Sequence, residues 1–225
     1  MTRLPSRPGS QPPGAWKLDA QSDPPRPHAP PAPLPEVYVS TDVEADGPIP
    51  GLHSMLSLGS AAYRADGTLI GTWTANLLPL PGASPDPETS RWWEKHPKAL
   101  AATTTGRRPP VEAMADYSAW VEGLPGNPVF VAYPVGFDFG FVHWYLVRFL
   151  GRSVFGESGL DMRSFAMALL RRKYRHSGKR AWPAHWHPAE LAHTHVALED
   201  ALEQGHQFCA MLAEMRGGGA RPAPL

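Results

Sequence analysis

The folded part of the sequence opens with Val37-Tyr38-Val39-Ser40-Thr41-Asp42-Val43-Glu44. The β-branched and aromatic residues of this stretch predict a strand. Because side chains alternate across a strand, Asp42 and Glu44 project from the same face near its end. Two neighbouring carboxylates repel each other unless a cation lies between them, and hard oxygen ligands of this kind suit Mg²⁺ or Mn²⁺. Acidic residues at strand ends are also common without such a role, so this pair alone leaves a structural explanation open.

The pattern further along the chain predicts two more long strands, several helices and one short buried strand. Residues 54–64 and 68–78 have the apolar runs of strands and flank Ala65-Asp66-Gly67, in which Asp-Gly is a strong hairpin signal. Helices are expected at residues 88–102, 111–124, 137–150, 161–172 and 198–215, and a buried strand at residues 129–133. This order predicts an α/β fold with a mixed central sheet and helices on its faces.

Composition divides the chain of 225 residues into one folded domain and two ends. There are 27 prolines, many of them before Glu36, so residues 1–35 have almost nothing to bury and are predicted to be a disordered tail. We expect one domain over residues 36–216 and a frayed end at residues 217–225. The tail would be either a solvated extension or a polyproline ligand for a proline-recognising partner.

Charge and cysteine content exclude some classes of protein. Lys and Arg total 21, equal to Asp and Glu at 21, so any contact with nucleic acid has to come from local basic patches. The single cysteine, Cys209, cannot form an internal disulfide and lies on the apolar stripe of the final helix, where a structural thiol is expected. Without a signal-peptide core or an apolar run approaching the roughly 18 residues of a membrane helix, we expect a cytoplasmic protein and no membrane contact.

Two more acidic positions follow the strand pair. Asp138, in Phe137-Asp138-Phe139-Gly140-Phe141, comes just after the short buried strand at the start of a helix, where Asp is also a common helix cap. Asp200 follows His195 by five residues at the head of the final helix. It lies off the apolar stripe of that helix, which alone would also fit a solvated surface acid.

Together and in this order, the three pieces resemble the DEDDh exonucleases of the ribonuclease H-like superfamily. The resemblance covers roughly residues 37–215. The motifs are Asp-x-Glu at Asp42 and Glu44, Phe-Asp at Phe137 and Asp138, and His-x-Ala-x-x-Asp from His195 to Asp200. The third motif is the most specific, because its histidine distinguishes the DEDDh branch from the DEDDy branch, which would need tyrosine at Val196.

The resemblance implies a ribonuclease H-like sheet and a metal-dependent 3′–5′ exonuclease. Asp42 would bridge two Mg²⁺ or Mn²⁺ ions, Glu44 and Asp200 would complete one site, and Asp138 would help to hold the second. His195 would take the proton from the attacking water. The partners would be 3′ ends of single-stranded RNA or DNA, and a homodimer is expected by analogy because many relatives act as dimers. Where the family often has a His-Asn pair before Phe-Asp, this sequence has Tyr133 and Pro134.

Several residues are candidates for substrate contact. Trp92 or Trp93 would stack on a terminal base, although core packing of at least one of them is the main alternative. Phe137 belongs to the second motif and is assigned to the substrate side. Arg171, Arg172 and Lys173 begin a basic stretch, continued by Arg175, Lys179 and Arg180, that would follow the phosphate backbone or be a solvated helix end. The His-x-His pairs at His185, His187, His193 and His195 lack cysteine partners, so zinc is not expected.

Two alternatives to an exonuclease remain at this stage. The first is a non-catalytic nucleic-acid-binding or scaffold protein on the same fold, with the Pro-rich tail as its interaction module. Intact acids at every motif position argue against it, because such a protein has no electrostatic reason to keep clustered carboxylates. The second is a ribonuclease H-like endonuclease. The histidine at His195 favours an exonuclease, and a circular substrate would distinguish the two, because only an endonuclease could cleave it.

Overall fold

The structure is a computed structural model that describes residues 34–189, 191 and 193–217. The predicted tail over residues 1–35 lies outside the described residues, except for Leu34 and Pro35. The predicted frayed end over residues 217–225 also lies outside them, except for Gly217. Within the part that the structure describes, no helix is long and apolar enough to cross a membrane.

The described residues form a five-stranded sheet with six α-helices and three short 3₁₀ helices. In chain order the elements are β1 (Glu36–Ala45), β2 (Met55–Tyr63), β3 (Leu69–Asn76), α1 (Pro87–Glu94), α2 (Pro97–Thr104), α3 (Pro110–Glu122), β4 (Asn127–Ala132), α4 (Val135–Leu150), β5 (Leu160–Asp161), α5 (Met162–Leu170), η1 (Tyr174–His176), η2 (Lys179–Ala181), η3 (Ala184–Trp186) and α6 (Ala197–Met215).

The sheet is mixed, as predicted, and β1 lies at its centre. The strand order is β3-β2-β1-β4-β5, with β1 antiparallel to β2 and parallel to β4. The β2–β3 hairpin turns at Asp66-Gly67, where Gly67 has a φ of 89° that favours glycine. A strand at the centre of a sheet is flanked on both edges, and β1 is accordingly buried from Val37 to Ala45. This placement fixes the backbone of β1, and so the positions from which its carboxylates project.

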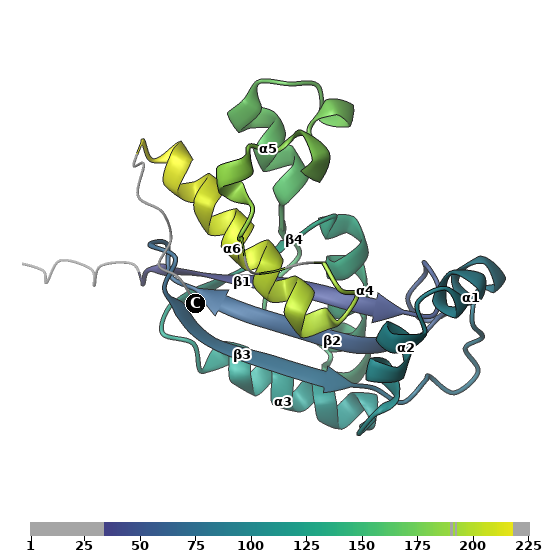
Figure 1. The fold of residues 1–225 in the computed structure, drawn as a ribbon. Helices are drawn as coiled ribbons and strands as arrows, with labels where there is room; N and C mark the ends of the chain where they lie inside the picture. The colour runs from purple at the N-terminus through teal and green to yellow at the C-terminus, as the bar shows by residue number, and fades with distance from the viewer. Residues whose placement is uncertain (1–33, 190, 192, 218–225) are drawn as a thin grey trace, which may run out of the picture. The chain divides into compact units, whose positions relative to one another are not determined.

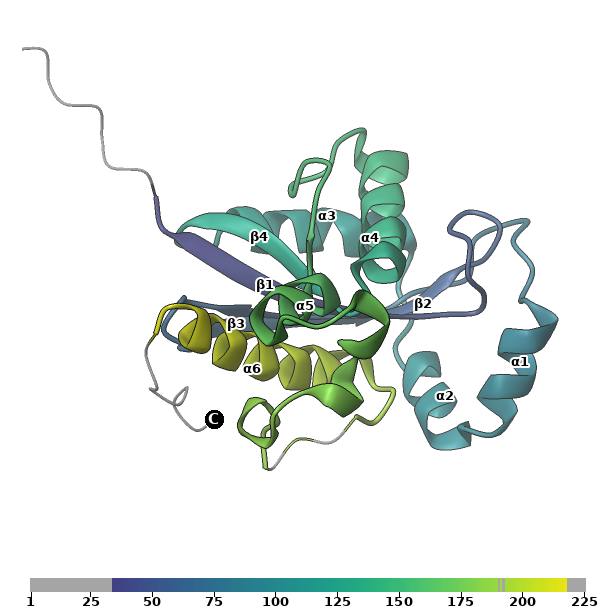
Figure 2. The same cartoon turned by 90° about the horizontal axis from the view of Figure 1, so that it is seen from above.

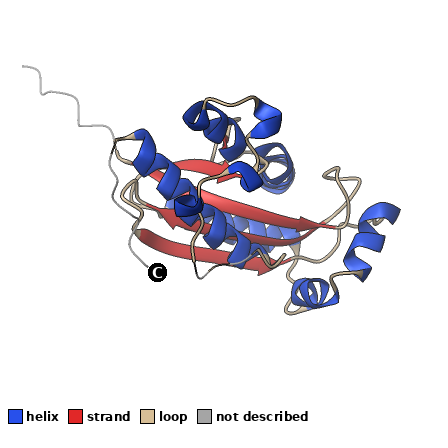
Figure 3. Ribbon diagram, turned by 45° about the horizontal axis from the view of Figure 1, so that its top comes forward, coloured by secondary structure: helices blue, strands red, loops and turns tan. Residues whose placement is uncertain are grey.

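Helices cover both faces of the sheet. Figure 2 shows α3 and α4 on one face and α6 lying across the other, while α1 and α2 lie beyond the strand ends (Figure 1). Figure 3 shows the same layers with the strands in red between the blue helices. One apolar cluster, which includes Met114, Phe130 and Phe141, fills the α3–α4 side, and another, which includes Phe208 and Met211, fills the α6 side.

The structure corrects one predicted helix and adds elements that the sequence pattern did not predict. The single helix expected at residues 88–102 is two helices, because Pro97 opens α2 and the residue before it, His96, has a non-helical φ of −124° and ψ of 53°. The two-residue strand β5 and the three 3₁₀ helices were not expected, since segments this short have no periodicity. Asp161 caps α5 by accepting the N–H of Ser164 at 2.7 Å.

Candidate active site

Four carboxylates from three elements converge beside the centre of the sheet. Asp42 and Glu44 come from β1, Asp138 from the first turn of α4 and Asp200 from the first turns of α6. All four are buried, and Asp200 is 0% exposed, so it is not the surface acid that its position off the apolar stripe would allow. The sequence-predicted acids are therefore brought together by the fold.

Asp138 is not a helix cap. No side chain caps α4, and Oδ1 of Asp138 instead accepts the N–H of Val43 at 3.0 Å. Val43 lies between Asp42 and Glu44 in sequence, so this bond ties the start of α4 to the middle of the acidic strand. Burial and the neighbouring Asp42 charge raise the pKa of Asp138 well above its usual range.

The chemistry of the donor set fits a divalent cation. One carboxylate oxygen each from Asp42, Glu44 and Asp200 lie within 4.8 Å of one another. Burial and mutual repulsion raise the pKa of both Asp42 and Glu44. Among the described residues, neither of these two forms an ion pair with a cationic side chain. An all-oxygen cluster with this much unbalanced charge is the kind of site that Mg²⁺ or Mn²⁺ occupies.

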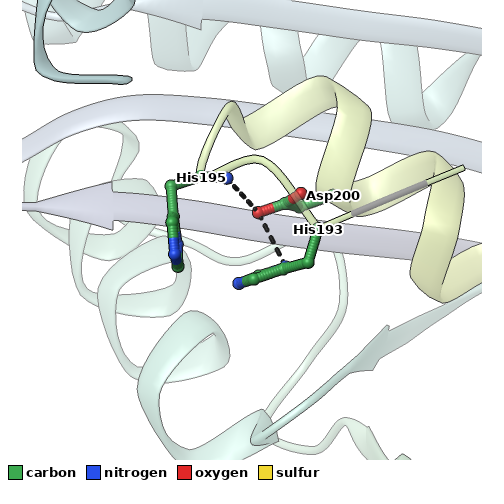
Figure 4. A group of neighbouring side chains, drawn as sticks. All are labelled: His193, His195 and Asp200. Carbon is green, nitrogen blue, oxygen red and sulfur yellow. Dashed lines mark hydrogen bonds and ion pairs between the residues drawn. The ribbon is translucent and has the colours of Figure 1, made fainter. Parts of the chain in front are cut away.

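Asp200 also positions the histidine of the third motif. Its carboxylate accepts the backbone N–H groups of Thr194 at 2.8 Å and His195 at 2.9 Å. Figure 4 shows this carboxylate between the backbone of His195 and the ring of His193, whose Nδ1 lies 3.0 Å from Oδ2. His195 has a φ of 60°, a left-handed conformation that costs a non-glycine residue about 1–2 kcal/mol. The two N–H bonds to Asp200 hold the backbone in this conformation.

The ring of His195 lies among three other rings. It packs edge-on against Trp92 at 4.8 Å, His96 at 5.0 Å and His193 at 4.3 Å between ring centroids. Burial, and then the charge of His193, lower the pKa of His195, so its imidazole is neutral near pH 7. His193 behaves in the opposite way, because its bonds to Asp200 and Glu203 raise its pKa to about 10.

The two tryptophans have different environments. Trp93 is 4% exposed, and its Nε1 donates to the carbonyl of Ala45 at 3.0 Å, so it packs in the core and supports the end of β1. Trp92 is half-buried and stacks on His96 at 4.0 Å. Trp92 therefore remains a candidate for stacking on a base. The assignment of Trp93 to the substrate side is corrected, because Trp93 packs in the core.

The other predicted substrate residues lie at the start of α4 and after the end of α5. Phe137 is half-buried and packs on Phe141 at 5.1 Å between centroids. Arg171, Arg172 and Lys173 are exposed after the end of α5. Cys209 is buried, and burial raises its pKa to about 12, which agrees with a structural thiol.

Sequence reasoning missed the residues of α6 that follow Asp200. Nε2 of Gln204 donates to Oδ1 of Asp42 at 2.8 Å, and Glu203 accepts from Lys179 at 3.0 Å. Although burial acts to raise the pKa of Glu203, His193 and Lys179 lower it to about 2. Their spacing was a usable signal, because residues three and four positions after Asp200 lie on the same face of the helix.

Comparisons with known proteins agree with this fold. No family model matches the sequence. The chain is 28% identical over 178 residues to the 3′-5′ DNA exonuclease Cap18 of Escherichia coli, which corresponds to 77% of this chain and 90% of that protein. The structure of this chain is similar to that of Pop2p of S. pombe in the Mg²⁺- and Mn²⁺-bound form, with a TM-score of 0.62 and 14% identity. The match covers 83% of this chain and 86% of the Pop2p chain.

Two further structures share the fold. The nuclease domain of 3′hExo, described as a DEDDh family member bound to rAMP, has a TM-score of 0.56 at 8% identity over 83% of this chain and 94% of its own. E. coli exonuclease I in complex with a dT13 oligonucleotide has a TM-score of 0.59 at 15% identity over 80% of this chain and 41% of its own. The fold is that of the ribonuclease H-like exonucleases. The likenesses confirm the predicted resemblance to the DEDDh exonucleases and the predicted enzyme class, a 3′–5′ exonuclease.

Proposed function

We propose that the chain hydrolyses single-stranded nucleic acid from its 3′ end and releases nucleoside 5′-monophosphates. The observation that carries this proposal is the convergence of Asp42, Glu44 and Asp200 within 4.8 Å, with His195 tied to the last of them by a backbone hydrogen bond of 2.9 Å. Clustered carboxylates beside a neutral imidazole supply metal ligands and a general base in one site.

Four residues would hold two Mg²⁺ or Mn²⁺ ions: Asp42, Glu44 and Asp200, with Asp138 beside Asp42. Divalent ions at such a site neutralise charge on the scissile phosphate and lower the pKa of a water molecule. The Pop2p structure, which is a Mg²⁺- and Mn²⁺-bound form, supports this choice of metals. Gln204 fixes Oδ1 of Asp42, and the N–H of Val43 fixes Oδ1 of Asp138, so both carboxylates are oriented before any ligand binds.

His195 would accept the proton of the attacking water. Its lowered pKa keeps the imidazole in the neutral, proton-accepting form at physiological pH. The hydrogen bond from its backbone to Asp200 and the packing of Trp92 and His96 fix where the ring lies. Trp92, stacked on His96, would provide a flat surface for the base at the 3′ end.

The test is the incubation of 5′-labelled single-stranded DNA and RNA with the full chain, in Mg²⁺ and in EDTA. DNA is the first substrate to test, because the E. coli relative is named a DNA exonuclease. We expect a ladder that shortens from the 3′ end in Mg²⁺ and no cleavage in EDTA. Cleavage of a circular single strand would mean an endonuclease, and an intact linear strand that nevertheless binds the protein would mean a non-catalytic binding protein.

A further inference from the structure

A second charged cluster lies outside the carboxylate site, in the segment between α5 and α6. Eight residues line a pocket there with a volume of about 400 Å³: Tyr133, Arg163, Arg175, His176, Gly178, Lys179, Arg180 and Ala181. Four of the eight are Lys or Arg and none is Asp or Glu. The pocket therefore has the electrostatic character of an anion site.

Specific contacts fix the positive charge at this pocket. Nε and Nη2 of Arg163 donate to the backbone carbonyls of Tyr174 and Arg175 at 3.0 and 3.2 Å, and the guanidinium lies 4.6 Å from the centroid of the Tyr174 ring. On the other side, the N–H of Lys179 donates to the hydroxyl of Tyr133 at 3.3 Å. A Cβ at Gly178 would lie 3.1 Å from that hydroxyl, so glycine allows the segment to pack closely on Tyr133.

The pocket is connected to the carboxylate site through Lys179. Its ammonium group pairs with Glu203 at 3.0 Å, and Glu203 lies one helical turn after Asp200 on α6. Tyr133 directly follows β4, five residues before Asp138. The Lys179–Glu203 pair thus joins the pocket to α6, which carries Asp200, and Tyr133 lies two residues before α4, which carries Asp138.

We propose that this pocket binds an internal backbone phosphate of the substrate strand, upstream of the scissile bond. The inference rests on the proposed function, because it takes the strand to end at the carboxylates. The ligand is a charged group and not a base, since Lys179 lies 5.6 Å above the Tyr133 ring and covers the aromatic surface that a base would use. Guanidinium groups match phosphate oxygens in geometry as well as charge.

This assignment changes which basic residues contact the strand. Arg171, Arg172 and Lys173 do not line the pocket, and Nη1 of Arg172 instead donates to the carbonyl of Ala181 at 3.4 Å. Arg163 belongs to α5 and stands outside the basic stretch of the sequence, so only the fold brings it to the pocket.

The first test measures binding in EDTA, where turnover is absent. Arg175→Ala and Arg180→Ala remove exposed pocket charges, and Arg148→Ala removes an exposed arginine on α4 as a matched control. For a single-stranded DNA of twelve nucleotides, we expect each pocket variant to bind about five- to tenfold more weakly and the salt dependence of log K to fall by about 0.7 per lost phosphate contact. A dinucleotide without a 5′ phosphate has no upstream phosphate, so its affinity should not depend on either arginine.

The second test locates the phosphate. Neutral methylphosphonates replace the backbone phosphates of the same strand one at a time. We expect one or two adjacent upstream positions at which the substitution weakens binding to the parent chain but not to the Arg175→Ala, Arg180→Ala double variant. If the double variant binds the strand as tightly as the parent chain, or if every methylphosphonate affects both proteins equally, the pocket does not hold a backbone phosphate.

A third arm asks whether the anion is a free one. Thermal unfolding is measured with inorganic phosphate and with a nucleoside 5′-monophosphate. If these anions stabilise the parent chain but not the double variant, while both proteins bind the strand equally well, the pocket is a small-anion site and the proposal is overturned. The proposed function fails separately. A strand that is not shortened in Mg²⁺ contradicts the exonuclease, whereas a shortened strand with a featureless methylphosphonate scan contradicts the pocket alone.

Discussion

Gly59 is the cross-strand partner of Asp42, and a side chain at Gly59 would collide with the backbone of Ala197 and Leu198 at the start of α6. The absence of a Cβ lets the first turn of α6 lie directly on β2. Because Asp200 belongs to this part of α6, the close approach is what brings the third motif to the strand that carries the first.

Substituting Gly59 with alanine should therefore separate the two halves of the site. The obstruction is backbone, which cannot rotate away as a side chain can, so we expect a loss of about 1–3 kcal/mol in stability and a large loss of exonuclease rate. Gly71→Ala is the control, because a Cβ on this β3 glycine meets its nearest neighbour, Trp120, at 4.0 Å. Thermal unfolding and rate measurements on both variants check the prediction, and equal behaviour of the two would contradict it.

The carboxylate cluster predicts an unusual pH dependence for the metal-free protein. Asp42 and Glu44 have raised pKa values in the folded chain, so above their ordinary value of about 4 the folded state binds more protons than the unfolded state. The stability contributed by these groups is present at low pH and is lost as pH rises through the folded pKa. In EDTA, the melting temperature should fall from pH 5 towards pH 8, and Mg²⁺ or Mn²⁺ should restore most of it at the higher pH.

Two variants isolate this effect from the other titrating groups. Asp42→Asn removes one of the repelling charges, so it should weaken both the fall in melting temperature with pH and the stabilisation by Mn²⁺. Asp116→Asn changes an exposed carboxylate of α3 that pairs with Arg108, and it should leave both intact. A metal-free parent chain whose melting temperature falls between pH 5 and pH 8 no more than that of Asp42→Asn would contradict the predicted electrostatics.

The neighbouring tryptophans should respond differently to substitution. Trp92→Ala removes the ring that stacks on His96 and is expected to weaken substrate binding by roughly 1–3 kcal/mol, the usual value of one stacked base, which would appear in KM. Trp93→Phe keeps an aromatic ring in the core but leaves the carbonyl of Ala45 without its donor, so it should lower stability by about 1–3 kcal/mol. If Trp93→Phe raises KM and Trp92→Ala does not, the roles are reversed.

His195→Ala tests the general base. We expect a fall in kcat of roughly 10² to 10⁴-fold with Mn²⁺ affinity almost unchanged. Since burial lowers the pKa of His195, the parent rate should fall only below the ordinary histidine value of about 6.5, and the variant should lack this acid limb. His185→Ala is the control, because His185 pairs with Glu214, about 21 Å along α6 from Asp200. Parental turnover in His195→Ala would show that the histidine is structural.

The sequence predicted the elements that are long and periodic, and the acids that lie on them. The mixed sheet, the hairpin at Asp66-Gly67 and the long final helix all follow from local patterns in the chain. The break at Pro97 was missed because the apolar pattern continues across it, although the proline itself was a visible signal. Which of Trp92 and Trp93 packs in the core could not be predicted, because the two adjacent residues differ only in what packs against them.

Residues that connect the motifs were harder to predict than the motifs themselves. Gly59 is recognisable as a contact only when β2 is placed against α6, and Arg163 joins the basic pocket only when α5 is placed beside the 3₁₀ segment. Both depend on pairs of elements far apart in the chain, for which a single sequence has no periodicity to read. The acid cluster was predictable because the family motif specifies all of its members at once.

The most direct test of the central claim is mass spectrometry of the first products released from a single-stranded oligonucleotide with a free 3′ hydroxyl in Mg²⁺. If the carboxylate cluster and His195 act as proposed, the first product is the nucleoside 5′-monophosphate of the 3′-terminal residue, together with a strand one nucleotide shorter. Asp42→Asn under the same conditions should give neither. A parent chain that releases internal fragments, nucleoside 3′-phosphates or 5′-terminal nucleotides would contradict the proposed function.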